Sequence, residues 1–186
     1  MIRRLWFRSL SRARIYRRLI LVERPLSEPV SNISPRVPVT VKVLAGSEIG
    51  AYMALRPQQH LAEIQRRLDE GHWCFAVWND QRIIHVAWAA AQHAKIEYLS
   101  REMELAPDQV YVYDIFTAPA FRRSGAASIR SVEMMRYFRE LGYQRLLGAV
   151  SPDDRSTFRQ TVGYRRIGVI GYVGLGPWRR AFCRSA

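Results

Sequence analysis

The chain has 186 residues, 48% of them hydrophobic, so it is long enough for one substantial core and too short for two separate enzymatic domains. It carries 29 Lys and Arg against 16 Asp and Glu, a net charge of +13, yet shows neither a run of the roughly 20 apolar residues that span a bilayer nor a secretory signal. Its two cysteines, Cys74 and Cys183, lie far apart, so we expect a reduced cytoplasmic protein.

Residues 1–24 hold over half of the excess charge, because they contain eight arginines against Glu23 alone, a net of +7 (8 − 1). Apolar residues from Ile2 to Ile20 recur near helical spacing, which predicts an amphipathic helix bordered by arginines. Such a helix suits an anionic membrane surface, which would place the protein at the inner face of the membrane. It suits packing on the protein's own core equally well. Nucleic acid is disfavoured because no groove-reading motif accompanies the charge.

Four of the nine prolines fall within residues 25–38, which indicates a linker. We expect the folded domain to span residues 38–176 and a basic, aromatic tail to follow over 177–186. The expected early elements are a strand at 40–44, a helix from Ser47 to Pro57, a helix from 61 to Gly71, and strands at 73–78 and 82–90 joined by a turn.

The stretch from Val110 to Ala127 predicts a strand, a turn and the start of a helix. Val110 to Phe116 is rich in β-branched and aromatic residues, and Pro119 ends the pairing. Apolar residues at helical spacing then continue to a stop at Gly142. The first-turn amides of this helix lack an intrahelical acceptor. With Gly125 and Arg122 beside them, they predict a loop that binds a diphosphate at a helix N-terminus.

The remaining elements complete a β-α-α-β-β-β-α-β-α-β order. They are a strand at 145–150, a short helix at 153–161, and one or two β segments from 164 through the glycine-containing tail. This order predicts an α/β (α+β) fold in which helices flank a central mixed sheet. The histidines and cysteines show no metal-ligand spacing, so no metal is expected.

The glycine loop resembles the signature of the GCN5-related N-acetyltransferase (GNAT) family, which is Arg or Gln, two residues, Gly, one residue, then Gly or Ala. The matching residues here are Arg122, Arg123, Ser124, Gly125, Ala126 and Ala127. Gly163-Tyr164 is similar to the Gly-Phe that begins the family's late strand. The resemblance covers residues 38–176 and excludes the basic arm. The arm and domain together are faintly similar to bacterial acetyltransferases of surface polysaccharide synthesis.

The resemblance implies that the chain binds acetyl-CoA as co-substrate, with the diphosphate on the amides of Arg123 to Ala127 and the pantetheine along Phe116 and Thr117. It implies acetyl transfer to a primary amine of a small molecule or a surface-polymer precursor. The family's usual Tyr acid is missing, because Arg159 stands there with Phe158 beside it. A non-catalytic acyl-CoA-binding module docked on a membrane complex and a nucleic-acid-associated protein therefore stay as alternatives.

Candidates for the general base are Asp114 and Tyr113 on the central strand, followed by His85 and Glu97. Asp114 lies just ahead of the expected thioester, but an ion pair with an arginine is the more frequent role of such a group. For His85, which lies in an apolar run, a hydrogen-bonded core histidine is favoured over a catalytic one. Arg56 is expected in the wall of the acceptor cleft, with a solvated side chain as the favoured interpretation.

Overall fold

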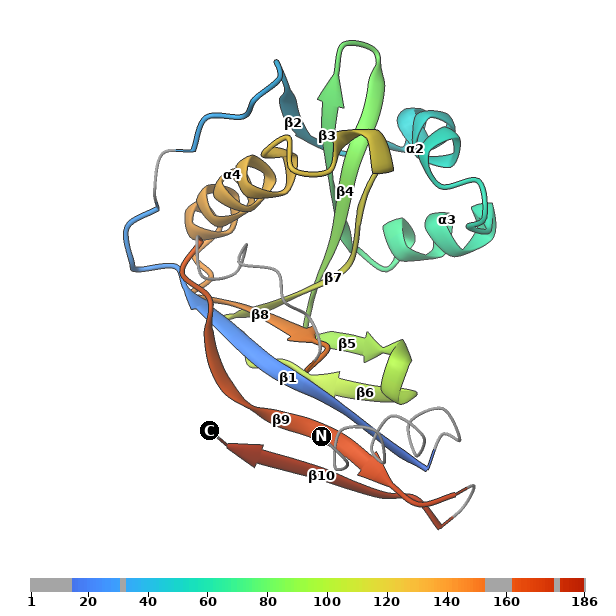
Figure 1. Cartoon of the computed structure of the whole chain (residues 1–186), viewed down its shortest axis with the longest axis vertical. Helices are drawn as coiled ribbons and strands as arrows, with labels where there is room; N and C mark the ends of the chain where they lie inside the picture. The colour runs from blue at the N-terminus through green and yellow to red at the C-terminus, as the bar shows by residue number, and fades with distance from the viewer. Residues whose placement is uncertain (1–14, 31–32, 153–161, 176–177, 186) are drawn as a thin grey trace.

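The computed structural model describes residues 15–30, 33–152, 162–175 and 178–185 (Figure 1). The strands are β1 (Tyr16–Pro25), β2 (Thr40–Val43), β3 (Trp73–Asn79), β4 (Arg82–Ala91), β5 (His93–Ile96), β6 (Arg101–Glu104), β7 (Gln109–Thr117), β8 (Arg145–Val150), β9 (Arg165–Val173) and β10 (Arg180–Ser185). The α-helices are α2 (Ile49–Leu55), α3 (Leu61–Asp69) and α4 (Ala126–Glu140), with 3-10 turns η1 (Gly46–Glu48), η2 (Glu97–Leu99) and η3 (Pro119–Phe121). An eight-stranded sheet has the order β10-β9-β1-β8-β7-β4-β3-β2, and β5-β6 forms a separate hairpin.

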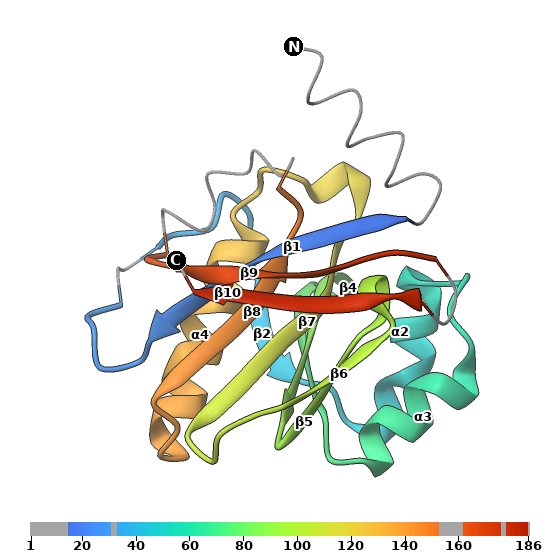
Figure 2. The same cartoon turned by 90° about the horizontal axis from the view of Figure 1, so that it is seen from below.

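Helices cover both faces of the sheet. Helix α4 packs on one face against β2, β3 and β4, whereas α2 and α3 pack on the other, against β4 and β3 (Figures 1 and 2). Strand β4 is therefore buried on both faces, which explains why its residues from Ile83 to Trp88 are apolar apart from His85. The expected mixed sheet flanked by helices is confirmed, because β7 and β8 are parallel and the other pairs are antiparallel.

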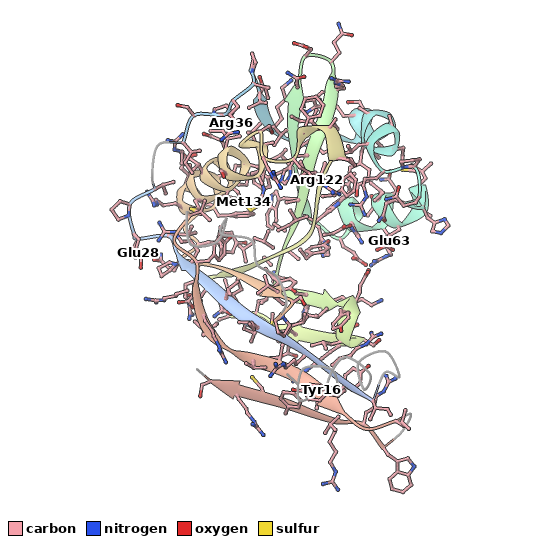
Figure 3. The ribbon with its side chains drawn as sticks, viewed as in Figure 1. Tyr16, Glu28, Arg36, Glu63, Arg122 and Met134 are labelled. Carbon is pink, nitrogen blue, oxygen red and sulfur yellow. The ribbon has the colours of Figure 1, made fainter. Side chains whose placement is uncertain are left out.

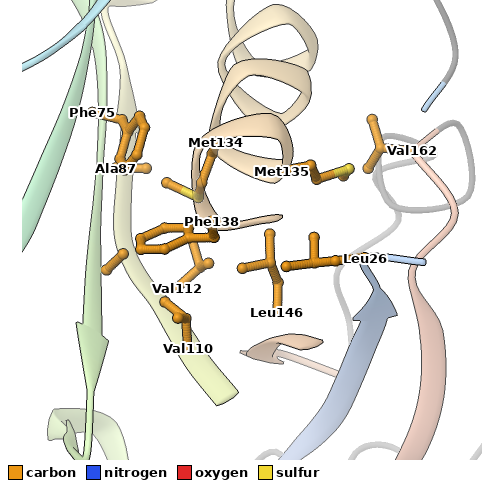
Figure 4. Packing of buried hydrophobic residues seen from close by; sticks show 11 residues of the cluster. Leu26, Phe75, Ala87, Val110, Val112, Met134, Met135, Phe138, Leu146 and Val162 are labelled. Atoms are coloured by element: carbon orange, nitrogen blue, oxygen red, sulfur yellow. The ribbon is translucent and has the colours of Figure 1, made fainter. Parts of the chain in front are cut away.

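The core between α4 and the sheet is apolar and continuous. Met134 and Phe138 extend from α4 into a cluster with Val110 and Leu146 on the strands, and Met135 extends toward Val162 (Figure 4). Val110, Met134, Met135, Phe138 and Leu146 are each at most 1% exposed. Truncating one of the Met, Phe or Leu side chains to alanine would therefore cost about 2 to 5 kcal/mol. This packing fixes α4 on the sheet.

The prediction of one helix over residues 1–24 is wrong for residues 16–24, which form β1. This strand lies inside the sheet and pairs with β8 on one side and β9 on the other. The run Leu19-Ile20-Leu21-Val22 suits a strand buried between neighbours, and short apolar runs do not distinguish helix from strand by periodicity. Hydrogen bonds to two partner strands decide between them. Residues 1–14 lie outside the described residues.

The expected domain boundaries also change. The folded unit includes β1, so it begins before Pro38, and the expected tail contains β10, which pairs with β9 over Arg180–Ser185. The connecting residues after β1 lack strand or helix where they are described, but they pack on the domain. Leu26 is 1% exposed, and Val30 and Ile33 pack on the core under α4. The proline-rich segment is therefore a docked connection rather than a free linker.

The other predicted strands and helices through residue 150 agree with the structure to within a few residues. The β5-β6 hairpin was not predicted, because its strands are short and half polar. It covers a second core cluster through Ala94, Ile96 and Leu99. The helix expected at 153–161 falls outside the described residues. No described helix is long and apolar enough to cross a membrane.

Candidate functional site

Strands β7 and β8 diverge in the middle of the sheet. They pair only over Gln109–Val112 and Arg145–Gly148, although β7 continues to Thr117. Beyond Val112, β4 is the only described strand that pairs with β7, and the register is irregular opposite Asp114, whose φ is 44°. As far as the described residues go, the other edge of β7 from Tyr113 to Thr117 is thus open to an extended ligand that pairs like a strand.

The turn after β7 leads directly to the N-terminus of α4. Arg123 and Gly125 both have positive φ, 65° and 90°, and Gly125 is the N-cap residue. The Ala126 amide donates to Ser124 Oγ at 3.3 Å. Within the described part of the chain, the amides of Arg123, Gly125 and Ala127 donate to no acceptor. Successive backbone N–H groups in such a turn, at the positive end of a 15-residue helix, form a site for an anion.

The residues of the signature, Arg122 to Ala127, differ in their exposure to solvent. Arg122 and Arg123 are exposed, Ser124, Gly125 and Ala127 are partly buried, and Ala126 is buried. Gly125 was expected to admit a diphosphate, but its close neighbour in the structure is Pro35. A Cβ on Gly125 would lie 3.2 Å from Pro35 Cα. The neighbouring Arg36, labelled with Arg122 in Figure 3, donates its amide to Ser124 O at 2.8 Å. The connecting segment therefore braces the loop.

Asp114 is held between two arginines. Arg56 Nη1 donates to Oδ1 at 3.1 Å and Arg67 Nη1 to Oδ2 at 2.6 Å. Both arginines are buried, at 8% and 4% exposed, so the expectation of a solvated Arg56 is wrong. The Arg56 guanidinium lies over the Phe116 ring, 4.5 Å from its centroid. Because both oxygens of Asp114 are engaged by fixed cations, the geometry favours the ion-pair interpretation over a free proton acceptor.

The hydrogen-bond partner of the Tyr113 side chain is His72, which lies just after α3. The Tyr113 hydroxyl and His72 Nδ1 lie 2.6 Å apart. They border a hollow of about 420 Å³ between α3, β5 and β7, which also has carboxylates of Glu63, Glu97 and Glu102 in its walls. Burial lowers the pKa of His72 below its usual 6.5 and raises the pKa of Tyr113. At neutral pH both groups are therefore uncharged, and His72 can accept a proton.

The remaining candidates are less central. His85 is fully buried and hydrogen-bonded, which confirms it as a core histidine. Glu97 lies in η2 with its side chain 68% exposed, 3.6 Å from Arg67.

Arg67 and His72 were not predicted as site residues. A signal for Arg67 was present, because it lies three positions after the buried Ile64, on the apolar stripe of α3. Among the described residues, no group of three His, Cys, Asp or Glu side chains could hold a metal.

Solved structures with similar architecture decide the fold. The aminoglycoside N-acetyltransferase AAC(6')-Iy, crystallised with CoA, superimposes with a TM-score of 0.54 at 21% identity, over 68% of this chain and 91% of that one. A GCN5-related N-acetyltransferase from Kribbella flavida gives 0.59 at 15% identity, over 86% and 59%. This chain has the GNAT fold. The enzyme AAC(6')-Ih from Acinetobacter baumannii gives 0.53 at 16% identity, over 69% and 91%.

Sequence comparison adds nothing to this assignment, because no protein-family model and no curated protein sequence matched the chain. At these identities, the GNAT fold is what the superpositions establish. The divergent β7 and β8, the open amides before α4 and the hollow beside Tyr113 are properties of this chain itself.

Proposed function

We propose that this protein transfers an acetyl group from acetyl-CoA to a primary amine of a small molecule or a surface-polymer precursor. The observation that carries the proposal is the continuous path from the open edge of β7 to the unpaired amides at the start of α4. An extended pantetheine arm pairs with the first, and a diphosphate accepts from the second. Solved proteins of this fold include aminoglycoside N-acetyltransferases, one of them crystallised with CoA, which supports the same assignment.

On this proposal, the coenzyme occupies the α4 side of β7 and the acceptor enters through the hollow beside Tyr113. The exposed Arg122 and Arg123 add positive charge near the diphosphate. The neutral amine attacks the thioester carbonyl, a tetrahedral oxyanion forms, and the C–S bond breaks to release the CoA thiolate. The proton lost by the amine leaves through Tyr113 to neutral His72, while the thiolate takes a proton from solvent.

Asp114 has a different part in this scheme. Its two ion pairs hold Arg56 over Phe116 and Arg67 between α3 and β7. A guanidinium fixed over Phe116 contributes positive potential where negative charge develops on the thioester oxygen. Asp114 is thus proposed as a positioning residue, and the His72–Tyr113 pair replaces it as the proton acceptor.

Binding to an anionic membrane surface also stays a proposal, but it no longer depends on one helix over residues 1–24. Of that segment, residues 16–24 belong to β1, so the contact depends on residues 1–14 and on the basic and aromatic residues of the segment 178–185. Trp178 is 84% exposed, and Arg180 and Arg184 lie on the edge strand β10. Co-sedimentation with phosphatidylserine vesicles, which is expected to weaken on deletion of residues 1–14, tests it.

Calorimetric titration with acetyl-CoA tests the coenzyme site. The variant Ala127→Pro removes one open amide at the second position of α4, where a proline in the first turn is tolerated. Ala62→Pro makes the same change at the second position of α3 and is the matched control. We expect a loss of affinity of about tenfold or more in Ala127→Pro alone, as one charge-assisted hydrogen bond disappears. Equal affinity in both variants would reject the coenzyme loop.

Turnover then separates an enzyme from a non-catalytic binding module. Acetylated products from a panel of primary amines are measured by mass spectrometry. We expect Tyr113→Phe and His72→Gln each to lower kcat by about a hundredfold or more while acetyl-CoA affinity is kept. Coenzyme binding without turnover of any amine would favour the binding module. Steeply salt-dependent nucleic-acid binding without coenzyme binding would favour the third alternative.

A further inference from the structure

Three polar side chains form a chain of hydrogen bonds that runs from the middle of α4 to the end of β7. Arg130 and His85 are 1% and 0% exposed, whereas Thr117 is partly buried at the edge of the proposed coenzyme site. Arg130 Nε lies 3.2 Å from His85 Nε2, and His85 Nδ1 lies 2.7 Å from Thr117 Oγ1. Burying an arginine and a histidine in a small core is costly unless their hydrogen bonds are specific.

The direction of each hydrogen bond follows from the chemistry of arginine. A guanidinium only donates, so His85 Nε2 accepts from Arg130 and carries no hydrogen. A neutral imidazole with an unprotonated Nε2 holds its proton on Nδ1. His85 Nδ1–H therefore donates to Thr117 Oγ1. Burial and the adjacent Arg130 both lower the pKa of His85 well below 6.5, consistent with a neutral ring at physiological pH.

Thr117 is the last residue of this hydrogen-bonded series, and its hydroxyl hydrogen is directed away from His85. Since its oxygen already accepts from His85, the O–H cannot be directed at the ring. In the part of the chain that the structure describes, the Thr117 hydroxyl makes no other hydrogen bond. Thr117 is followed by the short turn that leads to the open amides before α4.

We propose that the Thr117 hydroxyl donates a hydrogen bond to an oxygen of the coenzyme, and that Arg130 and His85 are positioning residues that fix this direction. The inference rests on the proposed acetyl-CoA function. The acceptor is a diphosphate oxygen or a pantetheine carbonyl, since both are acceptors without a competing hydrogen. Arg130 makes no direct contact with the coenzyme in this scheme. It acts through the tautomer of His85, and it selects against a ligand that presents a donor to Thr117.

The first test needs no coenzyme. Long-range ¹⁵N–¹H correlation spectra of the histidine-labelled protein report which ring nitrogen of His85 is protonated. The expected result is the Nδ1–H tautomer at pH 7, with a change to the Nε2–H form or a mixture in Arg130→Met. An Nε2–H tautomer or a doubly protonated ring in the parent protein would overturn the proposed direction.

The second test measures ligand affinity by calorimetry. Thr117→Val keeps the shape and removes the hydroxyl, Thr117→Ser keeps the hydroxyl, and Thr40→Val makes the same change at an exposed site on β2. We expect Thr117→Val to bind CoA about tenfold or more weakly, as for one lost hydrogen bond. Thr117→Ser should stay within about threefold, and Thr40→Val should be unchanged. Thermal unfolding of each variant checks that the comparison is between folded proteins.

Titration with ADP in place of CoA identifies the acceptor. If the diphosphate accepts, Thr117→Val weakens ADP binding as well. If a pantetheine carbonyl accepts, the loss appears with CoA alone. Equal CoA affinity of Thr117→Val and the parent would overturn the inference while leaving the proposed function intact. A folded parent protein that binds no CoA would instead reject the proposed function and the Thr117 contact together, and the His85 spectra would still decide the tautomer.

Discussion

Arg67 and Asp114 lie 47 positions apart in the sequence and meet in a partly buried ion pair of 2.6 Å. The pair joins α3 to the irregular segment of β7, and Arg56 completes it from the end of α2. Arg67 also stacks near Trp88 and Tyr113, at 5.2 and 5.3 Å from their ring centroids. One carboxylate thus ties both helices on this face to the strand that carries the proposed chemistry.

The first prediction concerns this carboxylate. Asp114→Asn removes the carboxylate that pairs with the buried Arg56, while Arg67 keeps its ion pair with Glu63, and it should lower the free energy of unfolding by about 3 kcal/mol. Urea denaturation measures it. Asp69→Asn, on the exposed side of α3, is the control and should change stability by no more than about 0.5 kcal/mol. An Asp114→Asn protein as stable as its parent, but inactive with every amine, would return Asp114 to the role of general base.

The second prediction concerns Gly125. Its φ of 90° disfavours any side chain, and a Cβ would meet Pro35 at 3.2 Å. Gly125→Ala should therefore cost about 1 to 2 kcal/mol and shift the loop away from the Pro35–Arg36 segment. In contrast, Gly50→Ala lies in α2 with nothing within 4 Å of the new Cβ. That control should be neutral or more stable by up to about 1 kcal/mol. Thermal unfolding compares the two, and equal melting temperatures would contradict the bracing role of Pro35.

The third prediction separates the two possible starts of the domain. A chain beginning at residue 15 keeps every described strand and should unfold cooperatively. A chain beginning at residue 38 loses β1, which leaves β8 and β9 without their shared partner and removes the buried Leu19 and Val22. We expect it to be insoluble or to lack a cooperative transition by circular dichroism. Cooperative unfolding of the shorter chain would show that β1 is dispensable.

The fourth prediction is a pH dependence. His85 has a folded-state pKa well below 6.5, so below pH 6.5 the unfolded chain binds more protons than the folded one. Stability from this group is complete above 6.5 and falls as the pH drops toward the folded-state pKa, by up to about 1.4 kcal/mol per pH unit. Urea denaturation between pH 7.5 and 5 measures the slope. His85→Gln should reduce this slope and leave the part that comes from His72, whose pKa burial also lowers, whereas His60→Gln, at an exposed site, should leave it unchanged.

Local sequence chemistry determined the parts of the fold whose partners are close in the chain. The β3-β4 hairpin closes through a turn at Asp80 with φ of 52°, and α4 begins directly after Gly125 and ends before Gly142. Their hydrophobic periods, glycines and prolines agree with one another, so the order of the elements from Thr40 to Val150 was predictable, except for the β5-β6 hairpin. The open amides at the start of α4 were also predictable from local sequence, because the first turn of any helix lacks acceptors for its N–H groups.

Tertiary structure alone decided the features that depend on partners far along the chain. Residues 16–25 form a strand because β8 and β9, more than a hundred positions away, offer hydrogen bonds on both edges. Asp114 became an ion-pair centre because α2 and α3 bring two arginines to it, and His72 met Tyr113 for the same reason. The amino-acid sequence identified the side chains that can carry charge or form hydrogen bonds. Which of them meet was set by the packing of the helices and strands, since hydrogen bonds need contact distances and ion pairs weaken as the distance between the charges grows.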